Sequence, residues 1–91
     1  MKNQKVIENF IGQVYNDSKS GTGNLYTTND NNKLVNYSTT IAKFDHNNKK
    51  LYVNVTKYSV TTSKIQTYLK RELSHVPNTY EIVYVNHADL N

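Results

Sequence analysis

The stretch from Lys50 to Leu73 changes its hydrophobic period halfway along, and this change constrains the fold more than any other feature of the sequence. In its first part every second residue is apolar, which is typical of a β-strand with one buried face. These strand residues are Leu51, Val53 and Val55. Further along, residues recur at steps of three and four, which predicts a helix with one buried stripe. The stripe consists of Ile65, Tyr68, Leu69, Glu72, Leu73 and Val76. A strand that leads directly into a helix is therefore the centre of the predicted fold.

A run of hydroxyl residues lies between this strand and this helix. The first N–H groups of a helix have no partner within it, so hydroxyl side chains predict a helix start. Ser63 and Gln66 also have the spacing of a capping box. Such a start, with free N–H groups, hydroxyls and a lysine, also favours anions. The candidate anion-binding residues are Thr61, Thr62, Ser63 and Lys64, with ordinary helix capping as the alternative.

A second amphipathic pattern, near the start of the chain, predicts another helix over residues 5–15. Its apolar residues are Ile7, Phe10, Ile11 and Val14. Gly12 falls on the polar side and weakens the helix by about 1 kcal/mol relative to alanine. Two amphipathic helices need an apolar surface to cover, and the apolar face of a sheet is the only large one available.

Short strand candidates occupy residues 24–28, 33–37 and 40–44, and turns rich in Asn and Asp follow the first and the third of them. A last strand candidate, residues 80–85, follows Pro77, which disfavours helix just before it. We therefore expect an α+β fold, a two-layer sandwich in the order α-β-β-β-β-α-β, forming a single domain over residues 1–91. Its sheet is an antiparallel meander of four to five strands, packed by two helices.

Composition argues against several function classes. The chain has no cysteine, which excludes disulfides and thiolate metal sites and suits the cytoplasm of a bacterial host. No apolar run approaches the roughly 20 residues that span a bilayer, so we expect no membrane partner. His46, His75 and His87 fall in a turn, at a helix end and in the tail, and no known catalytic or metal motif is present. We expect no enzymatic activity, no cofactor and no metal.

The net charge of +4 permits an acidic partner without requiring one. Lys64, Lys70 and Arg71 lie on the polar side of the second predicted helix and form a candidate basic binding stripe. The alternative is a solvated helix face. The tyrosines Tyr26, Tyr37 and Tyr52 are candidate contact residues on the polar side of the sheet, because tyrosine is frequent at binding hot spots. The alternative for them is cross-strand pairing that stabilises the sheet.

Two segments, Asn36–Ala42 and Lys57–Gln66, resemble a small domain of unknown function from phage, plasmid and other mobile-element proteins. That domain has a strand motif Leu-x-Ser-Tyr-Gly-x-x-Ile-Ala and then Tyr-Ser-x-Thr-Thr-Ser-Lys-His-Gln. Here Ser38 replaces the glycine and Ile65 replaces the histidine, which removes the motif's one titratable ring. The resemblance covers about residues 24–73 and implies a mobile-element origin without a defined activity.

Three functions follow as hypotheses. The first is a phage-type inhibitor, similar to anti-CRISPR proteins, that occludes a nucleic-acid or protein surface of a host defence nuclease; this step is analogy. The second is a nucleic-acid-binding accessory protein of a mobile element. The third is a binder of a nucleotide or small anion at the helix start Thr61–Lys64. The expected partner is thus a host protein or a nucleic acid.

Overall fold

The computed structural model describes residues 1–14 and 17–86, and two helices and five strands follow one another along this part of the chain. In chain order the elements are α1 (Asn3–Ile11), β1 (Leu25–Thr28), β2 (Lys33–Asn36), β3 (Thr39–Asp45), β4 (Lys50–Asn54), α2 (Val60–Glu72), a short 3₁₀ turn η1 (Leu73–His75) and β5 (Glu81–Val85). The predicted α+β fold and its order of elements are confirmed.

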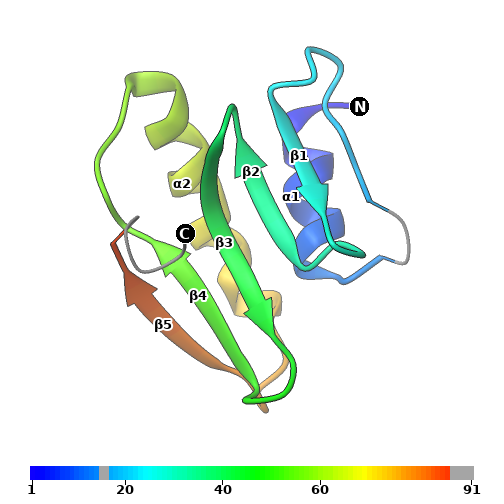
Figure 1. Cartoon of the computed structure of the whole chain (residues 1–91), viewed down its shortest axis with the longest axis vertical. Coiled ribbons are helices and arrows are strands. Elements are labelled where there is room, and N and C mark those ends of the chain that lie inside the picture. The colour runs from blue at the N-terminus through cyan, green and yellow to red at the C-terminus, as the bar shows by residue number, and fades with distance from the viewer. Residues whose placement is uncertain (15–16, 87–91) are drawn as a thin grey trace.

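The five strands form one sheet in the order β1-β2-β3-β4-β5. The first four pair antiparallel, because short turns join them, whereas β5 pairs parallel with β4. A parallel neighbour requires a crossover connection, and α2 with η1 provides it. Figure 1 shows both helices on the same side of the sheet, α1 behind β1 and β2, and α2 behind β3 and β4.

The core lies between the sheet and the two helices. Large apolar side chains from both layers are fully or almost fully buried there: Ile7, Phe10, Leu25, Leu34, Leu51, Val53, Ile65 and Leu69. The sheet therefore has a helix-covered face and a second face on which neither helix packs. This second face carries the alternate residues of each strand.

The helix α1 ends earlier than the apolar spacing predicts. Its last residue is Ile11, so Val14 lies beyond it and is 47% exposed instead of buried, while Tyr15 lies outside the described residues. Gly12 is the C-cap and not an interior residue, and Gln13 has a positive φ of 51°. The Gln13 amide donates to two main-chain carbonyls, Phe10 O and Asn31 O, which holds the chain in this turn.

The strand β4 also ends earlier than predicted, at Asn54, and Val55 is 39% exposed rather than in the core. At Asn54 side-chain hydrogen bonds take over on the β3 side: Oδ1 accepts from the Thr56 N–H, and Nδ2 donates to Thr40 O, while the Val55 N–H still donates to Val85 O in β5. The chain then turns away from the sheet toward α2. The alternation of apolar residues gave no sign of this local hydrogen bonding.

The helix α2 begins at Val60, and its N-cap is Ser59, whose Oγ accepts from the Thr62 N–H. The predicted capping box of Ser63 and Gln66 is wrong. Gln66 instead donates to the carbonyl oxygens of Asn54 and Thr56, at 2.9 and 3.0 Å. Its amide thereby fastens the helix to the end of β4.

Candidate functional site

The motif that carries the mobile-element resemblance has a structural role at several of its positions. Ser59 caps α2, Gln66 holds the end of β4, and the Tyr58 hydroxyl accepts from Asn54 Nδ2. Thr62 is only 5% exposed, and its hydroxyl donates to Asn36 Oδ1 at 2.8 Å. The hydroxyl and the N–H of Thr62 are thus both used within the protein, and Thr62 is not available to an anion.

The remaining candidate residues do not form one surface. Thr61, Lys64, Lys70 and Arg71 are exposed, and Ser63 is partly buried; all belong to α2. Tyr26 and Tyr52 are partly buried and alternate with the core residues of β1 and β4, so they lie on the face of the sheet away from the helices. Tyr37, in the turn between β2 and β3, is exposed with a φ of 57°. The α2 cations and the sheet tyrosines are therefore on different faces of the molecule.

We call the face of the sheet opposite the helices the open face. Strand register places its side chains in three rows that run across the strands. The first row contains Lys19, Tyr26 and Val35; the second Thr28, Lys33, Lys43, Tyr52 and Val83; and the third Asp45, Lys50 and Glu81. Both carboxylates are in the third row, so the first two rows carry three lysines and no acidic residue.

Two lysines of the open face are directly opposite each other. Lys33 and Lys43 are Cα partners across β2 and β3, an arrangement of like charges that destabilises a sheet. Within residues 1–14 and 17–86 the only basic and acidic side chains in close contact are His75 and Glu72, so neither lysine makes a close ion pair there. This juxtaposition depends on a bulge at Ile41, because the register shifts between Leu34 and Val35.

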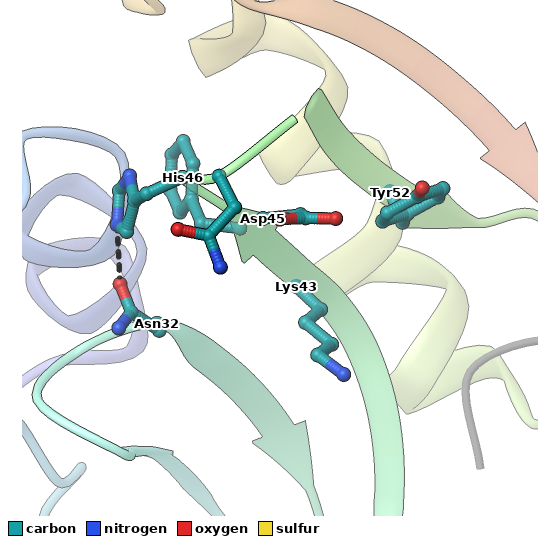
Figure 2. A pocket seen from close by; sticks show the side chains of 7 residues that line it. Asn32, Lys43, Asp45, His46 and Tyr52 are labelled. Carbon is teal, nitrogen blue, oxygen red and sulfur yellow. Dashed lines mark hydrogen bonds between the residues drawn. The ribbon is translucent and has the colours of Figure 1, made fainter. Parts of the chain in front are cut away.

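A cavity of about 630 Å³ opens where the open face meets the turn between β3 and β4. Its lining residues are Asn32, Lys43, Phe44, Asp45, His46, Asn47 and Tyr52. Figure 2 shows Lys43, Asp45 and Tyr52 on neighbouring strands around it, whereas His46 turns aside to Asn32. Hydrogen bonds from the Asn48 side chain and main chain lower the pKa of Asp45, and Lys43 adds a smaller attraction.

His46 is more than the solvated turn residue that the sequence suggests. Its Nε2 lies 3.0 Å from Gln13 Oε1 and 2.6 Å from Asn32 Oδ1, and its Nδ1 contacts the Tyr80 hydroxyl. The ring also stacks on Phe44, with centroids 5.5 Å apart. A neutral ring with the proton on Nε2 satisfies all three contacts. Both ring nitrogens are therefore occupied in joining separate parts of the chain.

The outward side of α2 carries a second concave surface, which we call the α2 groove. It has a volume of about 450 Å³ and is lined by Tyr58, Val60, Ser63, Lys64, Thr67, Tyr68 and Arg71. Val60 is 74% exposed, the largest exposed fraction among the large hydrophobic residues described. Desolvation raises the pKa of Tyr68, and the carboxylates of Glu8 and Glu72 raise it further. The groove thus combines apolar surface, two cations and a partly buried tyrosine.

The described part of the chain holds no group of three His, Cys, Asp or Glu residues arranged to bind a metal ion. None of the helices described there has the length and apolar content to cross a membrane. Fold and surfaces together define a small α+β protein with a lysine-bearing sheet face on which neither described helix packs. No protein-family model, curated protein or solved structure matches the chain.

Proposed function

We propose that this chain is a non-catalytic nucleic-acid-binding protein whose open face holds a single strand. The observation that carries the proposal is the pair Lys33 and Lys43, placed side by side by a bulge and without a close ion pair in the described residues. Opposed like charges cost stability, and a phosphate bound between them would turn this repulsion into attraction. Phosphate contacts of this kind supply most of the affinity for nucleic acids.

The tyrosines favour a single strand over a duplex. Tyr52 is the direct neighbour of Lys43 in the second row, and Tyr26 lies in the first. Bases stack on aromatic rings only when their faces are accessible, as in a single strand. The second row crosses five strands and is about 19 Å long at about 4.8 Å per strand, enough for a few nucleotides.

Two observations favour binding over catalysis. Both ring nitrogens of His46 contact neighbouring side chains, although the ring borders the cavity. The carboxylate of Asp45 accepts from the Asn48 N–H and from the Asn48 amide at 3.2 and 2.8 Å. The groups best placed for acid–base chemistry are therefore committed to holding the turn between β3 and β4. A partner in the cytoplasm of a bacterial host is consistent with this proposal.

A second candidate is the inhibition of a host defence nuclease, in the manner of anti-CRISPR proteins. The resemblance to mobile-element proteins suggests it, and the α2 groove favours it because that surface has the features of a protein contact. Competition for the single-stranded substrate through the open face would produce the same inhibition without any contact with the nuclease.

The test is fluorescence anisotropy with a labelled 15-nucleotide oligothymidylate and a 15-base-pair duplex. We expect single-strand binding that weakens with salt. The double variant Lys33→Glu/Lys43→Glu should lower the slope of log affinity against log salt by about 1.4, since each lost contact with a single strand removes about 0.7. Tyr52→Ala should cost about tenfold in affinity through lost stacking.

The matched control is Lys64→Glu/Arg71→Glu on α2. Each double variant replaces two cations by two anions and so lowers the net charge from +4 to zero. The control should retain at least most of the affinity of the parent. If both double variants lost the same affinity for oligothymidylate, only the net charge of the protein would matter. If the protein bound the duplex more tightly than the single strand, the stacking role of the tyrosines would be contradicted.

A further inference from the structure

The α2 groove remains unexplained by binding of a nucleic acid to the open face, because it lies on the other layer of the molecule. Its helical members Val60, Lys64, Thr67 and Arg71 recur at steps of three and four and so share one side of α2. Val60 belongs to the first turn and projects into solvent, with 74% of its surface exposed. This exposed valine and the two partly buried tyrosines give the groove an apolar part.

Two cations are positioned along this patch. Lys64 and Arg71 are seven residues apart, two helical turns, which separates their positions by about 10.5 Å along the axis. Both are exposed, and neither has a carboxylate partner in the part of the chain that is described. Apolar surface flanked by two unpaired cations is complementary to an apolar side chain flanked by two carboxylates.

The acidic residues near the groove restrict how such a partner lies. The Tyr68 hydroxyl is close to the carboxylates of Glu8 and Glu72, on the side of the groove that faces α1. These two charges repel a partner's carboxylates and direct them toward Lys64 and Arg71. A second copy of this chain is a poor occupant, because two molecules of charge +4 repel each other.

We propose that the α2 groove binds a short acidic amphipathic segment of another protein, with an apolar side chain against Val60 and carboxylates at Lys64 and Arg71. A nucleic acid offers phosphates for the cations but no aliphatic side chain for the valine. An amphipathic segment in an apolar groove is a common mode of peptide recognition. The partner surface is therefore a protein, distinct in chemistry from the ligand of the open face.

The experiment titrates ¹⁵N-labelled protein with three synthetic 14-residue peptides, one of Glu and Leu, one of Glu alone and one of Lys and Leu. The Glu/Leu peptide should shift the amide signals of residues 58–71 and leave those of residues 33–52 unchanged. The double variant Lys64→Glu/Arg71→Glu should lower the affinity for the Glu/Leu peptide about tenfold, because two ion pairs are lost and new repulsion arises. Val60→Ser should lower the affinity for the Glu/Leu peptide about threefold, because apolar contact is lost.

The open-face variant Lys33→Glu/Lys43→Glu is the control and should bind the Glu/Leu peptide about as tightly as the parent. If the Glu peptide bound as tightly as the Glu/Leu peptide, charge alone would explain the binding. If the Lys/Leu peptide bound as tightly, apolar contact alone would explain it. Shifts of the same amides with oligothymidylate, or with increasing protein concentration alone, would assign the groove to a nucleic acid or to a second copy. Each of these results would overturn the proposal, whereas the oligonucleotide affinities test the open face separately.

Discussion

The open face and the α2 groove both present lysines beside tyrosines, but they assemble these residues in different ways. On the open face, Lys33, Lys43 and Tyr52 come from three strands and meet through the register of the sheet. In the α2 groove, Lys64 and Arg71 come from one helix and meet through its periodicity. The first surface is a row of side chains across the sheet that borders a cavity, and the second is a groove along one helix with an exposed valine. The same residue types therefore favour two different partners.

The largest effect should separate the two sides of α2 itself. Leu69 is fully buried against the sheet, whereas Val60 lies exposed in the groove of the same helix. Leu69→Ala should lower the free energy of unfolding by about 2–5 kcal/mol, because it leaves a cavity in the core. Val60→Ala should change it by less than about 0.5 kcal/mol. Urea unfolding followed by circular dichroism measures both, and similar values would mean that the helix packs differently.

A smaller effect is expected at Asn54, which lies between the two surfaces. Its Nδ2 donates to Thr40 O in β3 and to the Tyr58 hydroxyl at the edge of the groove. Asn54→Ala should cost about 1–3 kcal/mol, because buried hydrogen-bonding groups lose their partner. The same substitution should also lower the affinity for the Glu/Leu peptide and leave the affinity for oligothymidylate unchanged. Asn78→Ala, at an exposed position, is the control, and a loss of oligonucleotide affinity in Asn54→Ala would show that the surfaces are coupled.

Sequence periodicity predicted the order of the elements and the exposed cations of α2, because both follow from local spacing. It did not predict the pairing of Lys33 with Lys43. The two-residue turn after Asn36 would place Lys33 opposite Ala42 if the ladder were regular, and the bulge at Ile41 moves it to Lys43. The partners of His46 were equally hidden, since they lie 14 to 34 residues away in the chain. The local spacing of residue types does not indicate such tertiary contacts.

The pair of Lys33 and Lys43 also tests whether residues that favour binding on the open face lower the stability of the protein. Lys33→Glu should raise the free energy of unfolding by about 0.5 kcal/mol, because a pair of opposite charges then replaces the repulsion with Lys43. The same variant should bind oligothymidylate more weakly. Lys64→Glu, on α2, faces no lysine across a strand and should not gain stability. The gain should shrink in 1 M salt, and its absence at low salt would mean that the two ammonium groups do not interact.

The smallest effect concerns Asp45, at the acidic end of the open face. Hydrogen bonds from Asn48 lower its pKa below the ordinary value of 3.8 that it has in the unfolded chain. The unfolded state therefore binds a proton more readily, and stability rises with pH between the lowered pKa and 3.8. The contribution is complete above that window and is lost as pH falls through the folded-state pKa. Asp45→Asn should be slightly less stable than the parent at pH 7, and the difference should vanish in acid.

The measurement compares urea midpoints of parent and variant between pH 2 and pH 7. Glu81→Gln is the control, because it removes a carboxylate from the same row of the open face without touching the turn. A stability difference for Asp45→Asn that stays constant down to pH 2 would show that the hydrogen bonds from Asn48 do not depend on the charge of Asp45. Because Asp45 is the carboxylate nearest Lys43 in its strand, its removal should also tighten oligothymidylate binding slightly and leave peptide binding in the α2 groove unchanged. If Asp45→Asn changed the affinity for the peptide more than the affinity for oligothymidylate, this would contradict the assignment of the nucleic acid to the open face and of the peptide to the α2 groove.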